Sequence, residues 1–239
     1  MTVQLFIPCF VDQLYPQTAF NMVKVLEKAG CVVQYNTSQT CCGQPAFNAG
    51  FRDEAKEVCL KFINDFKGAD YIVAPSASCV GFIRNYYLKL FDNSSLHNEV
   101  KDLGKRTFEF SEFLINVMGK DDFGASLNAT ATYHDSCAGL RECRIKNEPR
   151  KLLNRVKGLK LLEMNDVETC CGFGGSFAVK FESISVGMAD QKVINAAATG
   201  ARYIISTDHS CLMHLDGYIK YKGIKLETMH IADVLASGW

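Results

Sequence analysis

Two pairs of adjacent cysteines, each followed by glycine, are the residues of this chain best suited to chemistry. Each pair has one lone cysteine upstream and another downstream. The first thiol set is Cys9, Cys41, Cys42 and Cys79, and the second thiol set is Cys137, Cys170, Cys171 and Cys211. Thiolates are nucleophiles and soft metal ligands. A four-thiol pattern that occurs twice therefore predicts metal binding, cluster binding or thiol redox chemistry.

Adjacent cysteines favour a cluster over a single ion. The peptide that joins them is short and planar, which strains two sulfur bonds to one tetrahedral metal. In a multi-iron cluster, neighbouring thiolates can bind different irons. The glycine after each pair, Gly43 or Gly172, lets the backbone approach closely and donate its N–H to a cluster sulfur. Vicinal disulfide chemistry and buried structural thiols are the alternatives.

Composition excludes several classes of protein. The chain has 239 residues, of which 48% are hydrophobic and 22% charged, so it can form a proper core. Because 26 basic residues balance 26 acidic ones, bulk charge gives no reason to expect nucleic-acid or anionic-membrane binding. No apolar run approaches the ~20 residues of a transmembrane helix. The start of the chain lacks a basic leader, so we expect a cytoplasmic protein, either free or peripheral to the inner face of the membrane.

An internal repeat extends beyond the cysteines. Gly68–Val73 resembles Gly200–Ile205, and each of these segments leads to the last cysteine of its thiol set. Two homologous units are therefore expected, at residues 1–119 and 127–239. The polar, glycine-flanked stretch between them suits a linker.

Each unit is expected to alternate strands and helices. The predicted strands are Val3–Pro8, Cys31–Tyr35, Tyr71–Ala74, Thr130–Tyr133, Leu159–Met164 and Tyr203–Ser206. The predicted helices are Pro16–Ala29, Arg52–Phe66, Gly81–Leu90, Pro149–Val156, Ile184–Ala198 and Ile231–Ala236. This alternation predicts an α/β fold: two units with short parallel sheets flanked by helices, related by a pseudo-two-fold axis.

The expected strands place the thiols at one edge of each sheet. Every lone cysteine falls a few residues after a predicted strand, and each adjacent pair lies in a loop between a strand and a helix. The carboxyl ends of parallel strands are where such sheets bind ligands. We therefore expect the four sulfurs of each set to converge there.

The doubled pattern resembles the CCG cysteine-rich domain that heterodisulfide reductases and related oxidoreductases contain. Over essentially its whole length, the chain resembles the lactate utilization protein A family. The segments that carry the resemblance are Thr132–Cys137, Cys170–Lys180 and Ser210–His214.

The resemblance implies an iron–sulfur electron-transfer subunit of a complex that oxidises L-lactate to pyruvate. The implied cofactor is an iron–sulfur cluster, of the 4Fe–4S type at least in the second thiol set, with zinc open for one site. The implied partners are a ferredoxin-like iron–sulfur subunit and a third small subunit.

The sequence departs from the fuller CCG pattern, which ends each motif in C-x-x-C. Phe82 stands at the last position of the first motif and His214 at that of the second. His214 can replace a thiolate ligand, as imidazole does in Rieske centres, whereas Phe82 cannot. The first site is therefore open to a smaller cluster, zinc or no metal. His134 and Asp135, just before Cys137, are weak candidates, with His214, for catalytic or proton-transfer roles.

Two other functions fit the same thiols. A thiol–disulfide oxidoreductase subunit would use a cluster or an adjacent pair to reduce a disulfide, and thiol alkylation would inactivate it without loss of iron. A zinc-stabilised assembly subunit would hold stoichiometric zinc and catalyse nothing.

Overall fold

The computed structural model describes residues 1–239 and contains two parallel sheets of four strands each. The first sheet has the order β2-β1-β3-β4 and the second has the order β6-β5-β7-β8. The strands are β1 (Thr2–Leu5), β2 (Val32–Tyr35), β3 (Ile72–Ala74), β4 (Thr107–Glu109), β5 (Ser126–Tyr133), β6 (Lys157–Leu161), β7 (Tyr203–Ser206) and β8 (Glu227–His230). The predicted α/β fold with two parallel-sheet repeats is confirmed.

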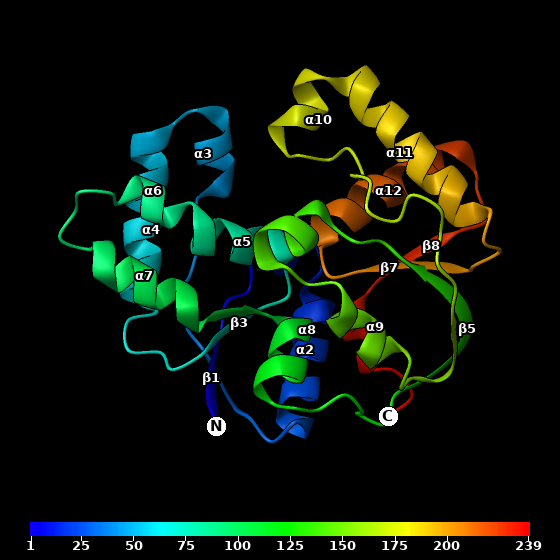
Figure 1. Ribbon diagram of the computed structural model, residues 1–239, viewed down its shortest axis with the longest axis horizontal. Helices are drawn as coiled ribbons and strands as arrows, with labels where there is room; N and C mark the ends of the chain where they lie inside the picture. Colours follow the sequence, from blue (N-terminus) through cyan, green and yellow to red (C-terminus); the bar gives the residue numbers. More distant parts are fainter.

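Helices connect the strands in both repeats (Figure 1). We call β1 to η1 the first unit and β5 to α13 the second unit. The first unit contains α1 (Cys9–Leu14), α2 (Pro16–Lys28), α3 (Gln44–Ala49), α4 (Arg52–Asp65), α5 (Ala77–Asn85), α6 (Tyr87–Leu90), α7 (His97–Arg106), α8 (Phe110–Glu112) and the π-helical turn η1 (Phe113–Val117). The second unit contains the π-helical turn η2 (Ala138–Cys143), α9 (Asn147–Leu153), α10 (Ser176–Lys180), α11 (Glu182–Ala197), α12 (His209–Lys222) and α13 (Ile231–Leu235).

The apolar pattern explains the long helices. Met22, Val25 and Leu26 recur on one face of α2 and are fully buried. Burying each such side chain contributes about 1.5–3 kcal/mol. Helix α2 begins at Pro16, and Gly30, with φ +87°, follows its end. Proline in the first turn and glycine just past the last turn are the usual helix boundaries.

Two predicted elements differ from the structure. The strand expected at Leu159–Met164 instead spans Lys157–Leu161, because pairing of Ala129 with Leu159 fixes its register on β5. The helix expected at Gly81–Leu90 is two helices, α5 and α6, and α5 already begins at Ala77. The Ser76 side chain accepts a hydrogen bond from the Cys79 N–H and so caps α5 earlier than expected.

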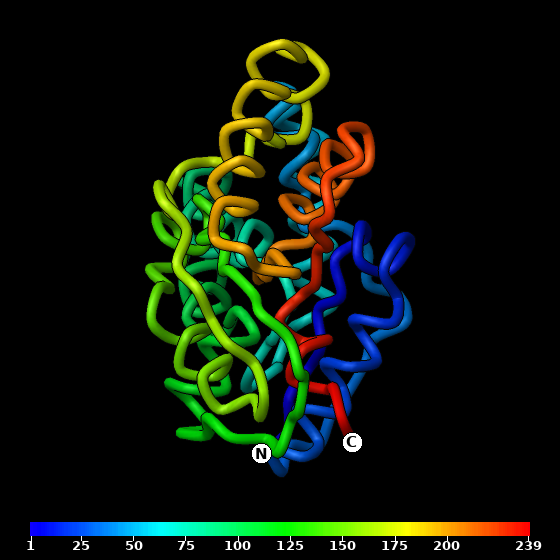
Figure 2. The backbone as a smooth tube through the Cα atoms, turned by 90° about the vertical axis from the view of Figure 1, so that its right-hand side faces the viewer, coloured from blue at the N-terminus to red at the C-terminus, as the bar shows by residue number.

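The two units share one core. A cluster of 26 buried residues includes Leu5 and Val73 of the first sheet and Tyr133 and Ile205 of the second. Helix α2 packs against α13, and Figure 2 shows these segments side by side near the chain termini. The termini lie at the end of the molecule opposite α3 and α10 (Figures 1 and 2).

An antiparallel bridge joins Ser76 to Asp208 between the units. These residues occupy equivalent places, because each caps the helix that follows the third strand of its unit, α5 or α12. Asp208 also accepts a hydrogen bond from the Ser78 N–H at 2.8 Å. Antiparallel pairing of equivalent residues is what a two-fold axis produces, and it supports the expected pseudo-symmetry.

Glu109 predicts an unusual pH dependence of stability. Its carboxyl caps α8 and is fully buried, with Oε1 unpartnered. Burial raises the pKa of Glu109 to about 8, against the opposing effect of the Ser111 hydroxyl hydrogen bond. Between about pH 4.5 and pH 8 the unfolded chain loses this proton and the folded chain keeps it, so stability falls as pH rises.

Glu109→Gln is therefore expected to flatten this slope and to stabilise the protein above pH 8 by on the order of 4 kcal/mol. Urea unfolding at a series of pH values measures the effect. Glu27→Gln, at an exposed position, is the control and should keep the original slope. Parallel pH profiles for Glu109→Gln and the unmodified protein would contradict the assignment.

Candidate functional site

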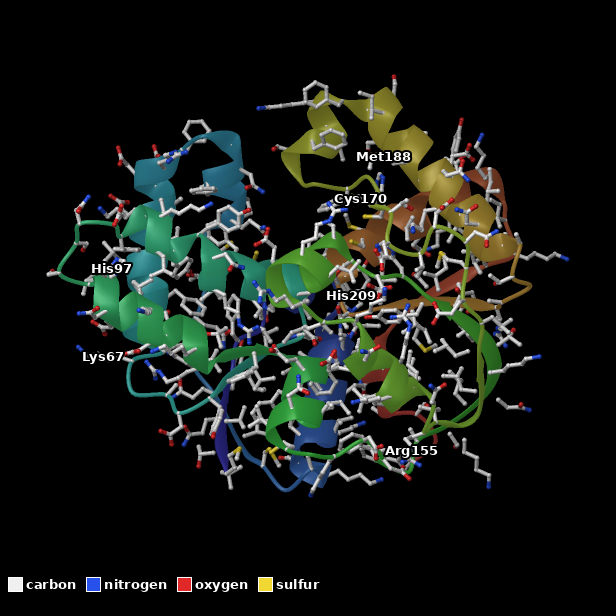
Figure 3. All side chains as sticks on the ribbon, in the orientation of Figure 1. Lys67, His97, Arg155, Cys170, Met188 and His209 are labelled. Carbon is white, nitrogen blue, oxygen red and sulfur yellow. The ribbon has the colours of Figure 1, made fainter.

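All eight cysteines of the two thiol sets line a single cavity of about 360 Å³ between the units. In Figure 3, Cys170 and His209, which also line it, lie near the middle of the molecule. The sequence predicted that the sulfurs of each set would meet, and the structure brings both sets to the same cavity. Sulfurs separated by most of the chain are thus available to one bound group or to two neighbouring groups.

The sheet edges position the lone cysteines. Cys9 is the first residue of α1, after β1, and Cys137 directly precedes η2, after β5. Cys79 and Cys211 lie in the first turns of α5 and α12, which follow the third strands. The carboxyl ends of the two innermost strands of each sheet therefore deliver one cysteine each to the cavity.

Within the first thiol set, the sulfurs form a chain of contacts. Cys42 Sγ lies 3.4 Å from Cys79 Sγ, and Cys41 contacts both Cys42 and Cys9. Cys42 is buried, whereas Cys9 is exposed at the cavity edge. The set is therefore closed on its inner side and open toward solvent at Cys9.

The second thiol set repeats this chain of contacts. Cys170 contacts Cys137 and Cys171, and Cys171 also contacts Cys211. Ligand atoms of His134, Cys171 and Cys211, which are all buried, lie within 4.8 Å of one another. The second set therefore has an imidazole beside its thiols, and is more enclosed than the first.

The first cysteine of each pair carries the most acidic thiol. Donation from Cys42 and Cys9 holds the pKa of Cys41 well below its usual value. Donation from Cys137 and Cys171 does the same for the pKa of Cys170. A backbone N–H also lies 3.4 Å from each sulfur, from Gly43 and Gly172 respectively. Each set thus holds one thiolate at neutral pH, which is the form that binds metals.

The glycine after each pair is required by its surroundings. Gly43 has φ +91° and Gly172 has φ +95°. A Cβ on Gly172 would lie 2.5 Å from the Ser185 carbonyl oxygen, and one on Gly43 would lie 3.2 Å from the Ala55 carbonyl oxygen. Only glycine combines this backbone conformation with so close an approach to the following helix. These contacts fix the turn that aims both adjacent sulfurs at the cavity.

The other predicted site residues have different surroundings. His214 Nε2 lies 3.2 Å from Ser185 Oγ, next to the second set, and does not belong to the group of His134, Cys171 and Cys211. Asp135 is buried and accepts two hydrogen bonds of 2.9 Å from Arg150, which indicates a structural ion pair. Phe82 is buried and stacks on Tyr86.

His134 has no hydrogen-bond partner. It is fully buried, and both of its ring nitrogens are unpartnered. Burial, reinforced by the charge of Lys192, lowers the pKa of His134 to about 3, so the ring is neutral. Buried polar atoms are rarely left without partners. The orphaned ring beside Cys171 and Cys211 therefore fits a bound metal or cluster.

Sequence reasoning missed the aromatic lining and Asp208. Phe10 and Phe173 both line the cavity, with their ring centroids 6.3 Å apart across the unit boundary. Each phenylalanine closely follows a patterned cysteine, which was the available signal. Asp208 lines the cavity and joins the units, and its place in a loop gave no sign of either role.

The donor set fits a metal ion or a metal–sulfur cluster. Eight thiols converge, two of them with depressed pKa values, and glycine N–H groups point at the adjacent pairs. Soft sulfur ligands select zinc, copper(I) or iron–sulfur clusters. None of the helices is long and apolar enough to cross a membrane.

Comparisons with known proteins agree with this site. The family model for the CCG cysteine-rich domain matches residues 3–84 and 131–216. Lactate utilization protein A 2 of Bacillus cereus (strain 03BB102) is 40% identical over 239 residues, covering 100% of this chain and 99% of the relative. Lactate utilization protein A of Halalkalibacterium halodurans is 43% identical over 235 residues, covering 98% and 96%.

A solved structure of a hypothetical protein from Helicobacter pylori has the same fold, with a TM-score of 0.62 at 14% identity. The match covers 100% of this chain and 49% of that one. The fold and the thiol sets thus define a protein with two CCG cysteine-rich domains. The chain belongs to the lactate utilization protein A family.

Proposed function

We propose that this chain is an iron–sulfur electron-transfer subunit of a complex that oxidises L-lactate to pyruvate. The observation that carries the proposal is the convergence of two four-thiol sets in one cavity of a lactate utilization family member. The first set would hold its centre through Cys9, Cys41, Cys42 and Cys79, and the second through Cys137, Cys170, Cys171 and Cys211. Iron–sulfur centres, when bound, take up and release single electrons.

The chain's own groups prepare the site for this task. Glycine N–H groups beside Cys41 and Cys170 stabilise negative charge on sulfur. Phe10 and Phe173 give the cavity wall an apolar lining, which limits the access of water. Oxidation of lactate to pyruvate releases two electrons and two protons. The two thiol sets would provide neighbouring places for those two electrons.

The complex, isolated under argon from its native cell with a tag on this chain, tests the proposal. Iron and sulfide should be present, and L-lactate should change the electron paramagnetic resonance signal of the iron. D-Lactate is the control and should leave the signal unchanged. Stoichiometric zinc without iron, as expected for an assembly subunit, would refute the proposal, as would iron that L-lactate leaves unreduced in the complete complex.

A thiol–disulfide oxidoreductase is the second candidate. The 3.4 Å separation of Cys42 Sγ and Cys79 Sγ and the acidic thiols of Cys41 and Cys170 favour it. This function predicts turnover of a dithiol–disulfide couple by the iron-free protein. Loss of that turnover on alkylation, with no response to L-lactate, would favour this candidate over the first.

A further inference from the structure

The two thiol sets have matching sulfurs but different residues beneath them. The residue after the central strand is Phe6 in the first unit and His134 in the second. Their equivalence follows from the backbone, because the Phe6 N–H donates to the Val73 carbonyl at 3.0 Å and the His134 N–H donates to the Ile205 carbonyl at 2.8 Å. One site therefore rests on an aromatic hydrocarbon ring and the other on an imidazole.

A second pair of equivalent positions differs in the same way. The carbonyls of Ala55 and Ser185 mark matching places on α4 and α11, since each abuts the glycine after an adjacent cysteine pair. Two helical turns further on, on the same helix face, lie Phe62 and Lys192. A buried phenylalanine in the first unit thus corresponds to a lysine in the second.

The first site has an apolar floor. Phe6 and Phe62 pack edge to face, with ring centroids 4.8 Å apart, and both are buried. Phe66 packs on both rings. No charged group lies among these residues in the aromatic and core contacts of the floor. Electrostatic support for the first set therefore comes from backbone N–H groups and not from a floor charge.

The second site has a polar, cationic floor. Lys192 is 0% exposed, and its Nζ donates to the carbonyls of Asp166 at 2.7 Å and Val167 at 3.1 Å. Burial lowers the pKa of Lys192, but the charges of Cys171, Asp135, Asp166 and Cys170 act in the opposite direction. A lysine is almost never fully buried without such compensation. Its charge and the neutral ring of His134 lie on the inner side of the second set.

We propose that Lys192, together with His134, makes the second thiol set the place where transferred electrons settle, and that the first set passes them on. The inference rests on the proposed function. When a one-electron reductant supplies one electron, the site gains one negative charge, Lys192 keeps its proton, and no bond breaks. A buried positive charge nearby stabilises that added charge, and an N–H from His134 toward the sulfurs does the same.

Lys192→Met tests the role of the charge at nearly constant side-chain length. Potentiometric titration followed by electron paramagnetic resonance should show the second site losing electrons to the first by a factor of about ten or more, which corresponds to about 59 mV for a one-electron couple. Phe62→Met, at the matched position of the first unit, should leave the distribution unchanged. Lys192→Arg keeps the charge and should shift it by much less than Lys192→Met.

His134→Phe gives the second unit the residue of the first and provides an independent variant if Lys192→Met unfolds. It should shift electrons in the same direction. Iron at both sets with an unchanged distribution in the Lys192→Met and His134→Phe variants would overturn the inference and leave the proposed function standing. A Lys192→Met protein with a lowered melting temperature and an unshifted potential would show a merely structural lysine. Absence of iron from both sets in the unmodified protein would instead overturn the proposed function.

Discussion

Replacing Cys170 with serine is expected to remove the iron of the second thiol set while the fold survives. Cys170 contacts Cys137 and Cys171, accepts the Gly172 N–H at 3.4 Å, and has the depressed thiol pKa of its set. A serine hydroxyl is not ionised at neutral pH and binds iron far less well than a thiolate. With both sets loaded, iron per chain should fall by roughly half, because one of the two four-thiol sites is lost. Anaerobic purification with iron and sulfide analysis measures this.

The controls separate ligand loss from general damage. Cys143 is buried, lies outside the cavity lining, and donates from Sγ to the Ala77 carbonyl at 3.3 Å. Serine can keep that hydrogen bond, so Cys143→Ser should retain all the iron. Cys41→Ser should remove iron from the first set. Unchanged iron in both Cys170→Ser and Cys171→Ser would refute the assignment of the second site.

The sequence was sufficient for the repeat, the parallel sheets and the place of the thiols. Periodic apolar residues marked α2 and α4, and short β-branched runs marked the inner strands. The cysteines could be placed because residues after parallel strands always meet at the same sheet edge. The edge strands β4, Thr107–Glu109, and β8, Glu227–His230, were missed, because three or four residues without an apolar run give no periodic signal.

The shared cavity and the charged floor were beyond sequence reasoning. Whether two homologous units face each other depends on tertiary packing, here on the contact of α2 with α13 and on the Ser76–Asp208 bridge. Lys192 has the local pattern of an exposed helical lysine, and its burial follows only from the loop carbonyls of Asp166 and Val167 that it contacts. His134 was noticed for its place at a strand end, and its missing partners appear only in three dimensions.

Replacing Gly172 with alanine is expected to cost at least about 3 kcal/mol of unfolding free energy and to disrupt the second site. Alanine at φ +95° is strained by about 1–2 kcal/mol. Its Cβ would also lie 2.5 Å from the Ser185 carbonyl oxygen and 2.9 Å from Met188 Cβ. Relieving such overlap typically costs a further ~1–3 kcal/mol. Helix α11 must shift, or the turn must open and move Cys170 and Cys171 apart.

Two other glycines isolate these contributions. Gly50 has the same φ of +95°, with nothing within 4 Å of its Cβ position, so Gly50→Ala reports the backbone strain alone. A Cβ on Gly43 would lie 3.2 Å from the Ala55 carbonyl oxygen and from Cys59 Sγ, which is a milder overlap. Urea unfolding should therefore rank the losses as Gly50→Ala, then Gly43→Ala, then Gly172→Ala. Equal losses for Gly50→Ala and Gly172→Ala would mean that close packing against α11 does not hold the adjacent cysteine pair in place.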